Sequence, residues 1–171
     1  MKNIAKVIAA AVVVLGSTST GSFAQATATA AASATIITPI TIVKNVDMNF
    51  GNVAVSASTL GTTVLAPAGT RTNTGGVTLP STTGTVAAAS FTVSGQASYT
   101  YAITLPSSCI ISSGSNQMTV NAFTSVPATT GTLNGSGTQT LNVGATLNVT
   151  AGQASGSYTN ATGVPVTVNY N

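Results

Sequence analysis

The 171-residue sequence contains no histidine and no tryptophan, it has a single cysteine, and Asp47 is its only acidic residue. General acid–base catalysis relies on titratable side chains such as His, Asp and Glu. Neither a Ser/His/Asp triad nor a pair of catalytic carboxylates can be assembled from this set. Transition metals prefer Cys and His ligands, and calcium usually needs several carboxylates. The composition therefore predicts a protein that is not an enzyme and uses no metal or other cofactor.

Positive charge is equally scarce. Of the four Lys and Arg residues, Lys2 and Lys6 lie at the N-terminus, which leaves Lys44 and Arg71 in the rest of the chain. Nucleic-acid binding requires clustered Lys and Arg that neutralise phosphates. Attraction to an anionic membrane surface depends on similar clusters. We therefore expect no nucleic-acid partner and no electrostatic membrane binding.

The first 24 residues have the three parts of a secretory signal peptide. A basic start, Met1–Lys6, precedes an apolar run, Val7–Leu15, and small residues lead to Ala24. This arrangement is typical of a signal peptide cleaved after Ala24. The apolar run is shorter than the roughly 20 residues that a membrane-spanning helix needs. We expect export through the secretory pathway to the periplasm, cell surface or medium, with no membrane span after cleavage.

Two further regions follow. Residues 25–34 read QATATAAASA and predict a flexible N-terminal extension, and residues 35–171 predict a single domain. In that domain, apolar residues alternate with Thr, Ser and Asn in short runs broken by Gly and Pro, which is typical of β-strands. About nine to ten short strands predict an all-β fold. An immunoglobulin-like Greek-key β-sandwich is the favoured architecture, with a jelly roll as the alternative.

Three local features of the predicted strands can be tested. The runs Ala88–Ser94 and Tyr99–Leu105 are separated by a short turn and predict a hairpin. Gly144 interrupts the apolar alternation of residues 138–150 and predicts a bulge or bend. Pro39 cannot donate to a β-ladder, so the strand expected around residues 36–42 should lie at a sheet edge or carry a bulge.

Few individual residues carry reactive chemistry. Cys109 has no partner for an intrachain disulfide, so it is either a packed apolar residue or a thiol for an intermolecular bond. Lys44 and Asp47 predict a surface ion pair, although their spacing along a strand places them on opposite faces. The tyrosines offer either sugar-stacking platforms or ordinary sheet residues: Tyr99, Tyr101, Tyr158 and Tyr170.

Several short motifs carry a resemblance to a known family. Thr35–Ile40 leads into Met48-Asn-Phe-Gly-Asn-Val53, and Ala89-Ser-Phe-Thr-Val93 precedes Tyr99-Thr-Tyr101. The chain closes on Val166-Thr-Val-Asn-Tyr-Asn171. This pattern resembles domain-of-unknown-function family 4402, whose members are small exported bacterial proteins. The resemblance covers almost the whole exported chain and implies no activity.

A weaker resemblance is to pilins of the chaperone–usher type. Their last strand alternates apolar residues and ends on a penultimate tyrosine, as do Val164, Val166, Val168 and Tyr170. The resemblance implies a fibre subunit whose groove is filled by a neighbour's N-terminal strand, with a periplasmic chaperone and an outer-membrane usher as partners. Here residues 25–42, with Ile36, Ile40 and Ile42, correspond to the donor. The pilin disulfide is absent.

The leading interpretation is thus a non-catalytic cell-surface structural protein, pilin-like or fimbrial, that self-associates by N-terminal strand addition. Strand addition supplies affinity through backbone hydrogen bonds and specificity through alternate side-chain pockets. Two alternatives stay open at this point. One is a secreted adhesin-like or carbohydrate-binding module. The other is a surface-layer or matrix protein that assembles without donor strands.

Overall fold

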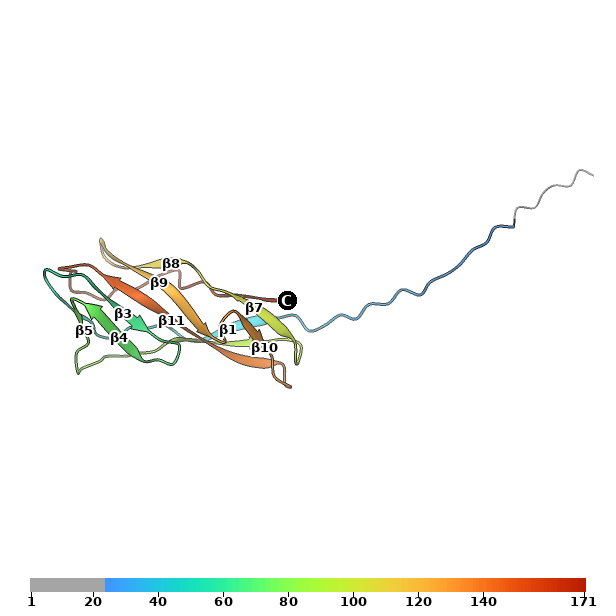
Figure 1. Cartoon of the computed structure of the whole chain (residues 1–171), viewed down its shortest axis with the longest axis horizontal. Helices are drawn as coiled ribbons and strands as arrows, with labels where there is room; N and C mark the ends of the chain where they lie inside the picture. The colour runs from blue at the N-terminus through green and yellow to red at the C-terminus, as the bar shows by residue number, and fades with distance from the viewer. Residues whose placement is uncertain (1–23) are drawn as a thin grey trace, which may run out of the picture. The chain divides into compact units, whose positions relative to one another are not determined.

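A computed structural model describes residues 24–171, and the chain divides after Thr35 into two units. The predicted signal peptide, apart from Ala24, lies outside the described residues. Residues 24–35 contain no helix or strand, and each of them is exposed. Residues 36–171 form the β-domain (Figure 1). Residues 24–171 contain no α-helix, and hence no helix that could cross a membrane.

Twelve strands occur in the described part of the chain. They are β1 (Thr41–Val46), β2 (Ala54–Val55), β3 (Gly61–Leu65), β4 (Arg71–Gly75), β5 (Val77–Thr78), β6 (Ala89–Ser94), β7 (Thr100–Thr104), β8 (Ser108–Ser113), β9 (Asn116–Val126), β10 (Thr130–Thr132), β11 (Thr138–Val149) and β12 (Thr167–Tyr170). All paired strands are antiparallel. The expected all-β fold is confirmed, with short additional strands beyond the nine or ten anticipated.

The strand order is that of an immunoglobulin-like sandwich. The long strand β11 is the centre of a seven-stranded sheet, with β6 and then β1 on one side and β9 and then β8 on the other. Strand β3 pairs with the second half of β11, on the same edge that β6 occupies along the first half, and β4 pairs with β3. A second sheet has the order β10-β7-β12. The path β1-β6-β11-β9 corresponds to immunoglobulin strands A-B-E-D, and β7-β12 corresponds to C-F.

The predicted hairpin between residues 88–94 and 99–105 is wrong. Both strands exist, as β6 and β7, but they belong to different sheets: β6 pairs with β1 and β11, whereas β7 pairs with β10 and β12. The connection between them crosses from one sheet to the other. Apolar alternation is satisfied equally by both arrangements, because in either case Phe91 and Tyr101 face one shared core.

The predicted bulge at Gly144 is confirmed, and the extra residue lies in the neighbouring strand. Gly144 and Thr146 of β11 pair with Thr124 and Asn121 of β9, so that two β9 residues lie opposite one β11 residue. At the same point the other edge of β11 changes partner from β6 to β3. A Cβ on Gly144 would lie 2.2 Å from the backbone oxygen of Leu65, where β3 ends. Only glycine allows this close approach.

Strand β1 begins after Pro39 and lies at a sheet edge, with a register shift between Lys44 and Val46. The expected edge position is therefore confirmed, but Pro39 lies outside the strand, and residues 36–40 are not part of it. The strand is shifted relative to the predicted run of residues 36–42. Proline at the entrance to an edge strand costs no ladder hydrogen bond.

Two clusters of buried apolar residues form the core. The first lies between the two sheets and includes Phe91, Leu141 and Val143 of the large sheet with Tyr101 and Val168 of the three-stranded sheet. The second includes Val120, Leu147 and Val149 together with Phe50 and Val77, and no residue of β7, β10 or β12 belongs to it. The three-stranded sheet thus covers only one half of the large sheet's inner face.

Candidate binding groove

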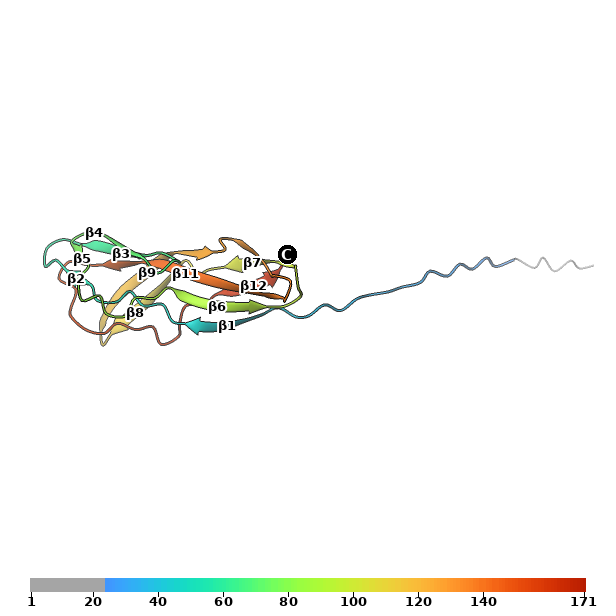
Figure 2. The same cartoon turned by 90° about the horizontal axis from the view of Figure 1, so that it is seen from below.

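Two strand edges that lie close together have no pairing partner in residues 24–171. Strand β1 pairs only with β6, and β12 pairs only with β7. Cα atoms of β1 and β12 approach within 8 Å of each other, yet no ladder connects them. The two strands run in opposite directions, with the start of β1 beside the end of β12 (Figure 2). In the immunoglobulin-like order, the free edge of β12 is the position of strand G.

A groove of about 1500 Å³ opens beside these edges. One wall is β1 with the segment that follows it, and includes Ile42 and Val46. The opposite wall is the loop of residues 153–164 together with Val166. The floor consists of apolar side chains that belong to the two core clusters: Met48, Phe50, Ala89, Phe91, Cys109, Ile111, Met118, Val120, Leu147 and Val149.

The groove exists because the second sheet is short. Beyond Val143, the inner face of β11 carries Leu147 and Val149, which in a complete sandwich would pack beneath an opposing strand. Here a loop without regular strand structure takes that place, attached to the large sheet by the single bridge between Ser112 and Thr159. Apolar side chains at the bottom of an open groove are typical of a binding site.

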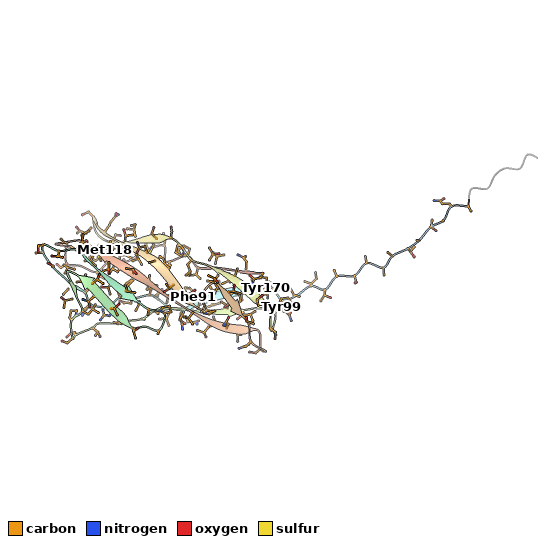
Figure 3. The ribbon with its side chains drawn as sticks, in the orientation of Figure 1. Phe91, Tyr99, Met118 and Tyr170 are labelled. Carbon is orange, nitrogen blue, oxygen red and sulfur yellow. The ribbon has the colours of Figure 1, made fainter. Side chains whose placement is uncertain are left out.

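At one end the lining of the groove stops at Ile42 of β1 and at Val166, and beyond this end Tyr170 links β12 to the chain entering β1. Its hydroxyl donates to the carbonyl oxygen of Thr38 at 2.7 Å and accepts the Gln96 backbone N–H at 2.6 Å. Its ring packs edge-to-face on Tyr99, with centroids 5.8 Å apart. Figure 3 shows these two tyrosines at one end of the domain and Met118, a floor residue, towards the other. The groove therefore extends from Ile42 and Val166 away from Tyr170, and we call the end beside Ile42 and Val166 the closed end and the opposite end the open end.

The groove carries almost no charge. The only ion pair among residues 24–171 joins Lys44 Nζ to Asp47 Oδ1 at 2.6 Å, on the rim, with both side chains largely exposed. The predicted surface pair is confirmed, but the inference that the two residues face opposite ways is wrong. Strand β1 shifts register after Lys44 and ends at Val46, so its alternation does not extend to Asp47. An uncharged groove favours an apolar or neutral occupant.

The residues predicted to take part in assembly occupy two kinds of position. Ile40 and Ile42 are half-buried against the first core cluster, and Ile42 also lines the groove. Ile36 is 92% exposed. From the C-terminal run, Val168 is buried, Val166 and Tyr170 pack against the same cluster, and Val164 and Val166 line the groove. The apolar alternation of residues 164–170 is therefore present, although only Thr167–Tyr170 form strand β12.

The other candidate residues lie apart from one another. Cys109 is half-buried against the second cluster and contributes to the groove floor. Tyr101 is buried, its hydroxyl donates to Gln139 Oε1 at 2.8 Å, and burial raises the pKa of its phenol. Tyr158 donates to the Ala154 carbonyl in the loop of residues 153–164. The four tyrosines thus do not share an exposed face that would form one stacking platform.

The floor of the groove is not recognisable in the amino-acid sequence. Phe50, Phe91 and Leu147 occur in ordinary strand patterns, and nothing in such a pattern tells whether an apolar face is covered. In residues 24–171 no three His, Cys, Asp or Glu side chains gather into a metal-binding group. The groove offers apolar side chains and the free edge of β1.

The domain is an all-β sandwich with an open strand position. The family model "Domain of unknown function (DUF4402)" matches residues 40–170, which is most of the sequence and nearly all of the β-domain. The chain belongs to this family, and the family description names no activity. Comparisons with curated proteins and with solved structures gave no significant match.

Proposed function

We propose that this protein is an exported, non-catalytic structural subunit of a cell-surface fibre, in which the groove of one subunit accepts an extended N-terminal segment from another. The observation that carries this proposal is the combination of the unpaired edge of β1, which lines the groove, with a floor of core side chains beside it. An inserted strand would pair with this edge and cover the floor.

The N-terminal extension has the sequence pattern that such a strand requires. Successive side chains of a strand point to opposite faces. From residue 26 to residue 36 one face would carry only apolar side chains: Ala26, Ala28, Ala30, Ala32, Ala34 and Ile36. The opposite face would be mostly Thr and Ser. Because Phe50, Phe91 and Met118 make the floor bulky, small facing side chains complement it.

The exposure of Ile36 agrees with this assignment. It is a large aliphatic residue, 92% exposed in the subunit, and it lies on the same face of the extension as the alanines. In a neighbouring groove it would be buried. The donor then ends before Ile40, because Ile40 and Ile42 pack against the core of their own subunit. The segment available to a neighbour is therefore residues 25–36.

An open groove also predicts partners during export. A groove with an apolar floor beside a free strand edge invites non-specific association. We propose that a periplasmic chaperone covers the groove until an outer-membrane usher or an equivalent assembly site brings two subunits together. The finished contact is head-to-tail, since the donor segment and the groove are different surfaces, and such contacts build filaments.

Electron microscopy of material sheared from expressing cells tests the proposal. The wild type is compared with a variant lacking residues 25–35, which leaves β1 and its core contacts intact. A matched control replaces the same residues by a Gly-Ser sequence of equal length. Fibres in the wild type and none in either variant would support strand addition. Soluble monomers in all three, or fibres in all three, would contradict it.

A further inference from the structure

The segment just before β1 is fixed at the closed end of the groove. The Thr38 carbonyl accepts the Tyr170 hydroxyl, and the Thr38 N–H donates to Gln96 Oε1 at 3.3 Å. The Tyr170 hydroxyl also accepts the backbone N–H of Gln96. Tyr170 and Gln96 together satisfy both backbone polar groups of Thr38. We refer to these contacts as the Thr38 clamp.

The residue after Thr38 makes the clamp stiffer. Thr38 precedes Pro39, and a residue before proline is restricted to extended conformations. The backbone at this point therefore does not form a turn. It continues from β1 past the end of β6 to the β6–β7 connection, where Gln96 lies. The β-domain thus begins at the closed end of its own groove.

This end has no space for an additional strand. Neighbouring strands lie about 4.8 Å apart, so two strands that flank an inserted one are separated by about 9.6 Å. Here Cα atoms of β1 and β12 lie within 8 Å of each other, and the Tyr170 side chain of β12 is hydrogen-bonded to the chain entering β1. Folding back of the extension into its own groove would require this bond to break.

We infer that the Thr38 clamp prevents each subunit from filling its own groove, so that the occupant is the extension of a second copy that enters from the open end. This inference rests on the proposed strand addition. An extension entering N-terminus first would lie parallel to β1 and antiparallel to β12, because β1 starts and β12 ends at the closed end. The clamp therefore determines whether the product is a polymer or a self-filled monomer.

Disulfide trapping separates the two products, since the only native cysteine, Cys109, lies in the groove floor. Single cysteines are placed at Ala26, Ala28, Ala30 and Ala32 of the full chain. Each is combined with the wild-type clamp, with Tyr170→Phe, and with Gln96→Ala. Tyr170→Phe removes the hydroxyl but keeps the ring that packs on Tyr99. Gln96→Ala provides a second test if Tyr170→Phe does not fold, as judged by circular dichroism.

After mild oxidation, non-reducing gels and mass spectrometry give the ratio of intramolecular to intermolecular disulfides. The inference predicts multimer ladders with the wild-type clamp. It predicts a ratio raised roughly two- to tenfold in Tyr170→Phe or Gln96→Ala, the range expected for loss of a hydrogen bond. Ladders with an unchanged ratio in the folded variants would overturn the clamp and leave strand addition standing. Intramolecular disulfides in the wild type would also overturn it. No disulfide at any position would overturn strand addition and the clamp together.

Discussion

Thr63 of β3 provides a sharp test of how the second core cluster is packed. Its side chain is fully buried, and its Oγ1 has no hydrogen-bond partner within the described part of the chain. A buried hydroxyl without a partner costs about 1–3 kcal/mol relative to a paired one. Thr63→Val replaces the hydroxyl by a methyl group of similar shape in a site that is already apolar. We expect the free energy of unfolding to increase by about 1–2 kcal/mol.

The adjacent residue is a matched control for the same substitution. The Thr62 hydroxyl is 2.7 Å from the Thr74 hydroxyl on the neighbouring strand β4. Thr62→Val removes this hydrogen bond and buries little new surface, so the free energy of unfolding should fall by up to about 1 kcal/mol. The two neighbouring substitutions are therefore expected to have opposite signs.

Urea unfolding of the exported chain, residues 25–171, followed by tyrosine fluorescence at low protein concentration, measures both effects. Each kcal/mol corresponds to about 2–4 °C in Tm for a chain of this size, so thermal unfolding gives a second reading. The urea m-value should stay unchanged. A destabilised Thr63→Val would refute the reasoning, because it would mean that the hydroxyl is paired in the folded protein.

Further substitutions test other parts of the account. Gly144→Ala should destabilise the fold by about 3 kcal/mol in the same urea assay, because the new Cβ would lie 2.2 Å from a β3 carbonyl oxygen. Gly135 has open space around it, so Gly135→Ala should change the free energy of unfolding by less than about 1 kcal/mol. Ile36→Ser should leave the free energy of unfolding unchanged but reduce the number of fibres in electron micrographs. Leu60 is also exposed, and Leu60→Ser should change neither the free energy of unfolding nor the number of fibres. Equal effects of the two substitutions on fibres would argue against Ile36 as a donor residue. Burial raises the pKa of Tyr101, so its contribution to stability is fully present below the unfolded value of about 10 and is lost as the pH rises through the folded pKa. Tyr101→Phe should therefore show a smaller loss of stability in strongly alkaline urea titrations than the wild type, and an unchanged profile would contradict this.

The strands with strict alternation were predictable from the sequence. Strand β6 places its apolar residues on one face, and the observed burial alternates accordingly. In β9 the alternation holds for Met118 and Val120 and breaks at the bulge, where Ala122 is exposed. Strand β4 was missed because Arg71–Gly75 has no apolar face and is almost entirely exposed. Its residues form a strand through pairing with β3, which is a tertiary effect.

Strand pairing was much less predictable than strand position. The short connection after β6 was expected to form a hairpin, but it crosses to the other sheet. Short-range pattern cannot distinguish these outcomes, because both bury the same side chains. The groove was hidden for a related reason. Leu147 and Val149 look like core residues in the sequence, and only the extent of the opposing sheet decides whether they are covered.

The C-terminal run and the isoleucines show how far sequence pattern can reach for the candidate site. Val168 and Ile40 were expected at an assembly surface, and the structure places both against the core of their own domain. The segment left for a neighbour is therefore residues 25–36, in which Ile36 is the only bulky apolar residue. Its alternation of alanine with threonine is a weak predictor of a strand, and it indicates a donor strand only once the groove is known.

Paired cysteine scanning between two differently tagged copies tests the central claim most directly. One copy carries Cys109→Ser and a single cysteine at each position from 26 to 35 in turn, and the other carries only the native Cys109 in its groove. A strand in the groove has one register, so it predicts disulfides between the two copies at one even-numbered alanine, or at two neighbouring even-numbered ones, and little at the odd-numbered positions beside them. Disulfides of equal yield at all positions, or none, would contradict insertion of the extension as a strand.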